Sequence, residues 1–121
     1  MIYLCSVYSL NSDGLGARKH SARMHRRFKY ARDYTAQRLK DGYCVFSPIA
    51  HCHPMQQAND MPPEWEFWEK LDYQFMDACS QVWVLQMPGW EESTGITAEI
   101  KYAEKHGIPI SYIVATDTEG L

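Results

Sequence analysis

Four short apolar runs divide the chain, and longer segments with helical periodicity separate them. The runs cover residues 1–8, 43–47, 81–86 and 108–114. None of them alternates strictly between apolar and polar residues, which is typical of strands that are covered on both faces of a sheet. Strands that alternate with helices form a parallel sheet joined by right-handed crossovers. The pattern therefore predicts an α/β fold.

The segments between the runs supply three predicted helices, over residues 21–40, 65–79 and 93–106. The first presents a periodic apolar face and is expected to end at Asp41-Gly42, and the third is expected to end at Gly107. We expect one three-layer domain over residues 1–121. Its central parallel sheet should have about four strands, as in flavodoxin-like and Rossmann-like folds.

Three segments show neither pattern. Residues 9–16 are rich in Ser, Asn, Asp and Gly, which predicts a loop. Residues 49–63 contain three prolines and two histidines, and we expect an irregular, functional loop there. Residues 115–121 are expected to form a loose tail.

Charge and cysteine usage limit the classes of partner. The net charge is −3, which favours neither nucleic acid nor a membrane surface. Nine of the twelve Lys and Arg residues lie within residues 18–40, so this helix either has a solvated basic face or directs some arginines at phosphate; Arg23, Arg26 and Arg27 are the candidates. No apolar run approaches the roughly 20 residues that span a bilayer. Four scattered cysteines and the absence of a signal peptide indicate a reducing, cytoplasmic location.

Asp72 occupies a position where a core side chain is expected. An apolar stripe runs at helical spacing through Trp65, Trp68, Phe75, Met76 and Cys79, and Asp72 falls on the same face. A buried carboxylate is unfavourable unless it is paired, hydrogen-bonded or used in function. Asp72 is therefore either a structural partner for a cation or backbone amide, or a site residue.

Glu99 repeats this anomaly in the last predicted helix. Ile96, Ile100 and Ala103 form its apolar stripe, and Glu99 lies at the edge of that stripe. In an open parallel sheet, ligands bind beyond the carboxyl ends of the strands, close to where this helix begins. Two core-facing carboxylates in one small domain suggest an active site, provided that they converge.

The start of the same helix is suited to an anion. Ser93 and Gly95 lie there, where free backbone N–H groups and the helix dipole favour negative charge. Gly95 would allow a ligand to approach the backbone closely. Ser93 could equally be a simple N-cap.

Several sequence segments together resemble one enzyme superfamily. They read IYLCS at residues 2–6, VFSPIAHCHP at 45–54, WEFW at 65–68 followed by Asp72, and GWEESTGITAE at 89–99. The chain resembles the nucleoside 2-deoxyribosyltransferase superfamily, and within it a small branch of phage and bacterial proteins similar to nucleotide N-glycosidases. The Ser-x-Gly-x-x-x-Glu spacing is the most specific part of the match.

The resemblance implies cleavage or exchange of the N-glycosidic bond of a nucleoside or nucleotide. By resemblance, Glu99 is the catalytic nucleophile, Asp72 lies near the leaving base and the sugar hydroxyls, and Tyr3 orients Glu99. Ser93 and Gly95 match residues that hold a 5′-phosphate. The chain departs from the relatives at Ser6-Val7, where they have Gly-Ser, and at Ser80, where they have Asp, so phosphate contacts from the first loop stay open.

The residue types suit this chemistry. Loss of a base passes through an oxocarbenium-like transition state, which a carboxylate such as Glu99 can stabilise or capture. A desolvated Asp72 with a raised pKa could protonate the leaving base. Tryptophan side chains could stack on the base, with Trp65, Trp68 and Trp90 as candidates beside an ordinary core role.

The remaining candidates lie on the loops at the same sheet edge. Ser6 and Ser47 follow the first two strands, and His51 and His53 follow the second. Two histidines at this spacing point in opposite directions in an extended segment, so we expect no metal, and we expect no other cofactor. We interpret these four residues as substrate-binding candidates.

We expect an enzyme that acts on a small nucleoside or nucleotide and assembles as a homodimer or larger homo-oligomer. A basic first helix and the Ser93 helix start favour a nucleotide hydrolase over a transferase. Two alternatives stay open: a non-catalytic nucleotide sensor or sponge on the same fold, and a plain interaction module. The sequence does not define the base, the sugar or the biological role.

Overall fold

A computed structural model describes residues 1–10, 16–62 and 64–121. Its centre is a four-stranded sheet in which every neighbouring pair is parallel, in the order β2-β1-β3-β4. The strands are β1 (Ile2–Cys5), β2 (Val45–Phe46), β3 (Gln81–Gln86) and β4 (Ile110–Val114). The predicted four-stranded parallel α/β fold is confirmed.

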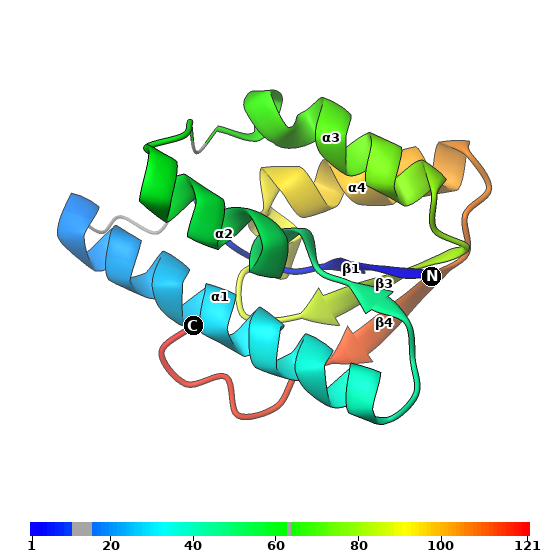
Figure 1. Cartoon of the computed structure of the whole chain (residues 1–121), viewed down its shortest axis with the longest axis horizontal. Helices are drawn as coiled ribbons and strands as arrows, with labels where there is room; N and C mark the ends of the chain where they lie inside the picture. The colour runs from blue at the N-terminus through cyan, green and yellow to red at the C-terminus, as the bar shows by residue number, and fades with distance from the viewer. Residues whose placement is uncertain (11–15, 63) are drawn as a thin grey trace.

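Helices cover both faces of the sheet (Figure 1), and the fold is Rossmann-like. In Figure 1, α3 and α4 lie together on one side, α1 lies on the other, and α2 packs beside α1. The helices are α1 (Ala17–Lys40), α2 (Pro48–Asn59), α3 (Trp65–Asp77) and α4 (Thr94–Lys105), with a 3₁₀ turn, η1, at Trp90–Glu92.

The strand order places β1 and β3 at the centre of the sheet. Tyr3 pairs with Val82 and Cys5 with Val84, and the side chains of both strands enter one continuous apolar core. From β1 the chain crosses to β2 on one side, whereas β3 lies on the other side. A crevice opens beyond the carboxyl ends of strands at such a reversal of order, and this is where ligands bind in open α/β sheets.

The prediction of an irregular loop over residues 49–63 is wrong for most of the segment, because Pro48–Asn59 forms α2. Ser47 caps this helix by accepting a hydrogen bond from the backbone N–H of Ala50 at 3.1 Å. Pro48 at the first helical position lacks only an N–H that would have no partner within the helix. The helix has no amphipathic sequence pattern and contains Pro54, so periodicity could not reveal it.

The prediction of a loose tail over residues 115–121 is also wrong. Arg26 Nε donates to the carbonyl of Gly120 at 3.0 Å, and Arg27 Nε donates to the carbonyl of Leu121 at 3.0 Å. Tyr30 exchanges hydrogen bonds with the backbone of Thr116. These contacts fix the tail against α1, so two of the three arginines considered for phosphate hold backbone carbonyls instead.

Smaller differences concern boundaries. α1 starts at Ala17, four residues before the prediction, and buries Met24, Phe28, Ala31 and Thr35 while Leu39 is exposed. The predicted loop 9–16 lies largely outside the described residues.

All four cysteines are free thiols. None of the helices in the described ranges combines the length and apolar character needed to cross a bilayer.

Candidate active site

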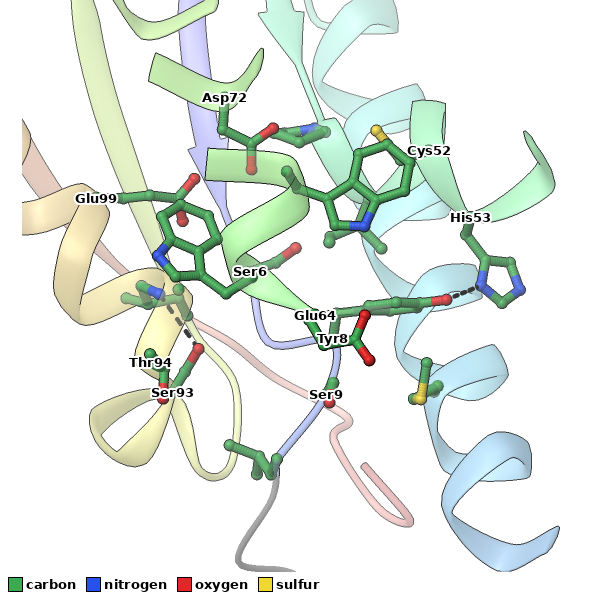
Figure 2. A pocket seen from close by; sticks show the side chains of 18 of the residues that line it. Ser6, Tyr8, Ser9, Cys52, His53, Glu64, Asp72, Ser93, Thr94 and Glu99 are labelled. Atoms are coloured by element: carbon green, nitrogen blue, oxygen red, sulfur yellow. Dashed lines mark hydrogen bonds between the residues drawn. The ribbon is translucent and has the colours of Figure 1, made fainter. Parts of the chain in front are cut away.

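A cavity of about 720 Å³ opens at the carboxyl end of the sheet (Figure 2). Its walls come from β1 and the loop after it, from the first half of α1, and from α2, α3 and the start of α4. The residues that line it include Ser6, Tyr8, Cys52, His53, Gln56, Glu64, Trp65, Trp68, Asp72, Ser93, Gly95 and Glu99. Small-molecule sites fall in the range of about 300–1,000 Å³.

Asp72 and Glu99 converge on this cavity. Asp72 is 7% exposed and Glu99 is 6% exposed, so neither is an ordinary solvated helix residue. Figure 2 shows their carboxylates, from α3 and α4, turned toward the same space. The convergence that the sequence left open is therefore present in the structure.

Glu99 meets the hydroxyl of Tyr3, which is fully buried in β1. Tyr3 donates a hydrogen bond to Glu99 Oε2. Hydrogen bonds from Tyr3 and Cys5 only partly offset the effect of burial on the pKa of Glu99. Oδ1 of Asp72 is buried without a partner among the described residues, and no Lys or Arg there forms an ion pair with either carboxylate.

The balance of these effects keeps protons on the pair. Burial raises the pKa of Asp72 to about 7. Burial, and then the charge of Asp72, raise the pKa of Glu99 to about 8. Since double ionisation is disfavoured for like charges in a desolvated site, the pair retains about one proton near neutral pH. Two carboxylic groups that share a proton beside an open cavity are equipped for acid–base and nucleophilic work.

The start of α4 forms the wall beside Glu99. Ser93 Oγ accepts a hydrogen bond from the backbone N–H of Ile96 at 3.2 Å, so Ser93 is an N-cap as well as a lining residue. A Cβ on Gly95 would stand 3.4 Å from the ring of Trp65, which leaves little room for a side chain. Ser6 Oγ, from the loop after β1, is buried without a partner among the described residues.

The structure brings most predicted site residues together, but not all. Ser6, His53, Trp68, Asp72, Ser93, Gly95 and Glu99 line the cavity, and Tyr3 lies directly behind Glu99. Ser47, His51 and Trp90 do not line it. Ser47 is the cap of α2, His51 packs against Phe46 and Phe75, and Trp90 packs against Tyr112.

Sequence reasoning missed the wall that faces α1 and α2. Tyr8, Cys52, Gln56 and Glu64 line the cavity there. Three of them could have been found only by recognising α2 or its junction with α3, and Tyr8 was assigned to the first strand. Tyr8 could have been found only by knowing where β1 ends. The strand ends at Cys5, which leaves Tyr8 free to turn into the cavity.

A metal ion has little support in this cavity. Within residues 1–10, 16–62 and 64–121, no three His, Cys, Asp or Glu side chains are grouped so that they could ligate one. His51 and His53 face different neighbours: His51 lies against Phe75, whereas His53 contacts Phe28 and His25.

Comparison with known proteins gives a family without an activity. No curated protein matches the chain. A family model described as a domain of unknown function, DUF1937, matches residues 1–115, which is nearly the whole chain. That description assigns no chemistry, so the resemblance to nucleoside 2-deoxyribosyltransferases stays a proposal. The chain belongs to the DUF1937 family.

Proposed function

We propose that this protein cleaves the N-glycosidic bond of a nucleoside or nucleoside 5′-monophosphate, with Glu99 as nucleophile. The observation that carries the proposal is the convergence of two buried carboxylates, Glu99 and Asp72, on one cavity large enough for such a ligand. The Tyr3 hydroxyl holds Glu99 in place from inside the core.

The reaction follows from the chemistry of the pair. Glu99 attacks the anomeric carbon while the bond to the base breaks, and the electron pair of that bond leaves with the base. Asp72 donates its proton to the departing base, so the base leaves uncharged. Water, deprotonated by Asp72, then releases the sugar from Glu99 and restores both groups; a second base in place of water gives exchange.

A bound substrate decides which carboxyl of the pair carries the proton. Without substrate the pair holds about one proton, and either carboxyl can carry it. Positive charge that develops on the sugar favours ionisation of the carboxylate next to it, which is Glu99 under this proposal. The proton then belongs to Asp72, where the leaving base needs it. The raised pKa values therefore support the two roles that the resemblance implies.

The start of α4 favours a phosphorylated substrate. Backbone N–H groups at a helix N-terminus and the helix dipole attract an anion, and Gly95 leaves the backbone accessible. The Ser6 hydroxyl, which has no partner among the described residues, is a further donor on the same cavity. We therefore favour nucleoside 5′-monophosphates over nucleosides, and hydrolysis over exchange. The basic helix contributes less to this preference than its sequence indicated, because Arg26 and Arg27 hold the tail.

The test is release of free base. The protein is incubated with ribonucleoside and deoxyribonucleoside 5′-monophosphates, and free base is measured by chromatography. Glu99→Gln should abolish release, whereas Glu104→Gln, an exposed carboxylate on the same helix, should release base like the wild type. Tight nucleotide binding without release would favour a sensor or sponge. No binding by calorimetry and no thermal shift would favour an interaction module.

Self-association is part of the same expectation. Tyr112 and Val114 are exposed on β4, which is an edge strand of the sheet. An exposed apolar edge strand is a common place for chains to pair. Light scattering on the purified protein should give the mass of a dimer or a larger assembly, and the mass of one chain would contradict this expectation.

A further inference from the structure

A chain of hydrogen bonds runs from the cavity to the surface of α1, away from the carboxylate pair. The hydroxyl of Tyr8 bonds to Oε1 of Gln56 at 2.8 Å and to Nδ1 of His53. Nε2 of His53 bonds to Nδ1 of His25 at 3.1 Å. Tyr8, His53 and Gln56 line the cavity, whereas His25 is exposed.

The amide of Gln56 sets the direction of every bond in this chain. Its Nε2 donates to the carbonyl of Met61 at 3.4 Å, so Oε1 is the atom turned toward Tyr8. Tyr8 has one hydroxyl hydrogen, and this hydrogen goes to Oε1. The tyrosine oxygen must therefore accept the other bond, which requires a hydrogen on Nδ1 of His53.

The same reasoning fixes the outer half of the chain. His53 with its hydrogen on Nδ1 has a lone pair on Nε2 when it is neutral. That lone pair accepts from Nδ1–H of His25, and Nε2 of His25 remains at the exposed end. Every donor thus points inward, from His25 to His53 to Tyr8.

The surroundings favour a neutral His53. It is 3% exposed and its ring stacks on Phe28 with centroids 4.4 Å apart. Burial, and then the neighbouring His25, lower the pKa of His53. A neutral imidazole that donates at one nitrogen and accepts at the other can pass a proton through without holding it.

We propose that Tyr8 donates a proton to the leaving base and that His53 and His25 replace this proton from solvent. The inference rests on the proposed function, and it adds a second proton donor to Asp72. With a proton from each donor the base leaves as a cation, and it returns one proton to solvent after it dissociates. Figure 2 places Tyr8 and Asp72 on different sides of the cavity, so the two would meet different edges of a bound base.

The transfer balances as one proton moved inward. A nitrogen or oxygen of the base replaces Gln56 as the acceptor of the Tyr8 hydrogen. As that hydrogen leaves, Nδ1–H of His53 gives its proton to the tyrosine oxygen, and Nε2 of His53 takes the Nδ1 proton of His25. His25 regains a proton from water through its exposed Nε2, and rotation of the two imidazole rings restores the original direction of the chain.

Concerted replacement answers an objection to tyrosine as an acid. Burial raises the pKa of Tyr8 to about 12, so a lone Tyr8 hydroxyl would be a weak donor. A proton that arrives from His53 as the hydroxyl proton departs avoids a buried tyrosinate. In this step His53 and His25 therefore act through Tyr8.

Three variants test the relay in the base-release assay. Tyr8→Phe keeps the ring and removes the hydroxyl, and we expect release to slow by about a hundredfold or more even in the first turnover. His25→Asn keeps a hydrogen-bond donor for His53 but cannot carry a proton. Because His53 gives up its proton only as it takes one from His25, we expect release to slow by about tenfold or more from the first turnover onward. Added imidazole, which can deliver the missing proton, should restore the rate. His106→Asn, which replaces an exposed histidine at the end of α4, is the matched control.

The outcomes separate the relay from the function on which it rests. Base release by wild type with an unchanged Tyr8→Phe or an unchanged His25→Asn would overturn the relay and leave the proposed function standing. No base release by wild type from any nucleotide would overturn the proposed function and the relay together. Thermal melting of each variant shows whether it is folded. Should Tyr8→Phe unfold, the exposed His25 position still decides, because its predicted signature is rescue of the slowed release by added imidazole.

Discussion

Replacing Glu99 by Gln should stabilise the protein at alkaline pH, although it removes the proposed nucleophile. Burial and the charge of Asp72 raise the pKa of Glu99 from 4.5 to about 8 in the folded protein. Between these two pH values the folded protein keeps a proton that the unfolded chain releases. Stability from this group is therefore complete below pH 4.5, falls as the pH rises toward 8, and stays lost above it.

The size of the effect follows from the same numbers. A tenfold change in an equilibrium constant is worth about 1.4 kcal/mol, so this rise in pKa corresponds to at most about 5 kcal/mol. Small domains have a total free energy of unfolding of about 5–15 kcal/mol. Glutamine is nearly isosteric and never ionises, and its carbonyl can still accept from Tyr3. We expect Glu99→Gln to gain about 2–5 kcal/mol over wild type at pH 9 and little at pH 5.

Urea denaturation at pH 5, 7 and 9, followed by circular dichroism, measures this difference directly. Glu104→Gln on the exposed side of α4 should follow the wild type within about 0.5 kcal/mol at every pH. If the free energy of unfolding falls equally steeply with urea concentration in both proteins, the substitution has not changed the compactness of the unfolded state. Equal stability of Glu99→Gln and wild type at pH 9 would mean that Glu99 is not held in a desolvated, like-charged environment.

Three further predictions concern other parts of the site and its support. Tyr3→Phe removes the hydroxyl that donates to Glu99, so the pKa of Glu99 should rise and the pH profile of base release should shift upward; an unshifted profile would contradict this. Gly95→Ala should weaken nucleotide binding in calorimetry, because the added Cβ would stand 3.4 Å from the ring of Trp65 at the cavity wall; unchanged binding would contradict this. Arg27→Met should lower the free energy of unfolding by about 2–4 kcal/mol, since the buried guanidinium donates to two backbone carbonyls; a loss below about 0.5 kcal/mol would exclude this role.

The central sheet and the carboxylate pair could be predicted because their signals are local. Continuous apolar runs identify the parallel strands, although β4 is largely exposed. Helical spacing shows that Asp72 lies on a buried face. That Asp72 and Glu99 meet could not follow from spacing alone. It depends on strand order, which places α3 and α4 side by side on one face of the sheet.

The α2 wall of the cavity could not be predicted for a physical reason. Its sequence has no apolar stripe, because α2 uses polar and aromatic contacts with α1 instead of a hydrophobic face. Once the segment is helical, residues two apart point about 200° apart around the axis. His51 and His53 therefore separate, and only His53 reaches the cavity. Ser47 becomes the helix cap rather than a substrate contact.

The carboxylate pair also bears on the choice between an enzyme and a passive binder. Burying Asp72 and Glu99 without a cationic partner among the described residues destabilises the fold at neutral and alkaline pH. Their negative charge would repel a phosphorylated ligand, so a sensor or sponge would bind more tightly with neutral residues at these positions. A positively charged transition state reverses that sign, because the same charges then stabilise what the cavity holds. A residue pair that weakens both folding and ground-state binding is consistent with selection for the transition state, which favours catalysis over storage.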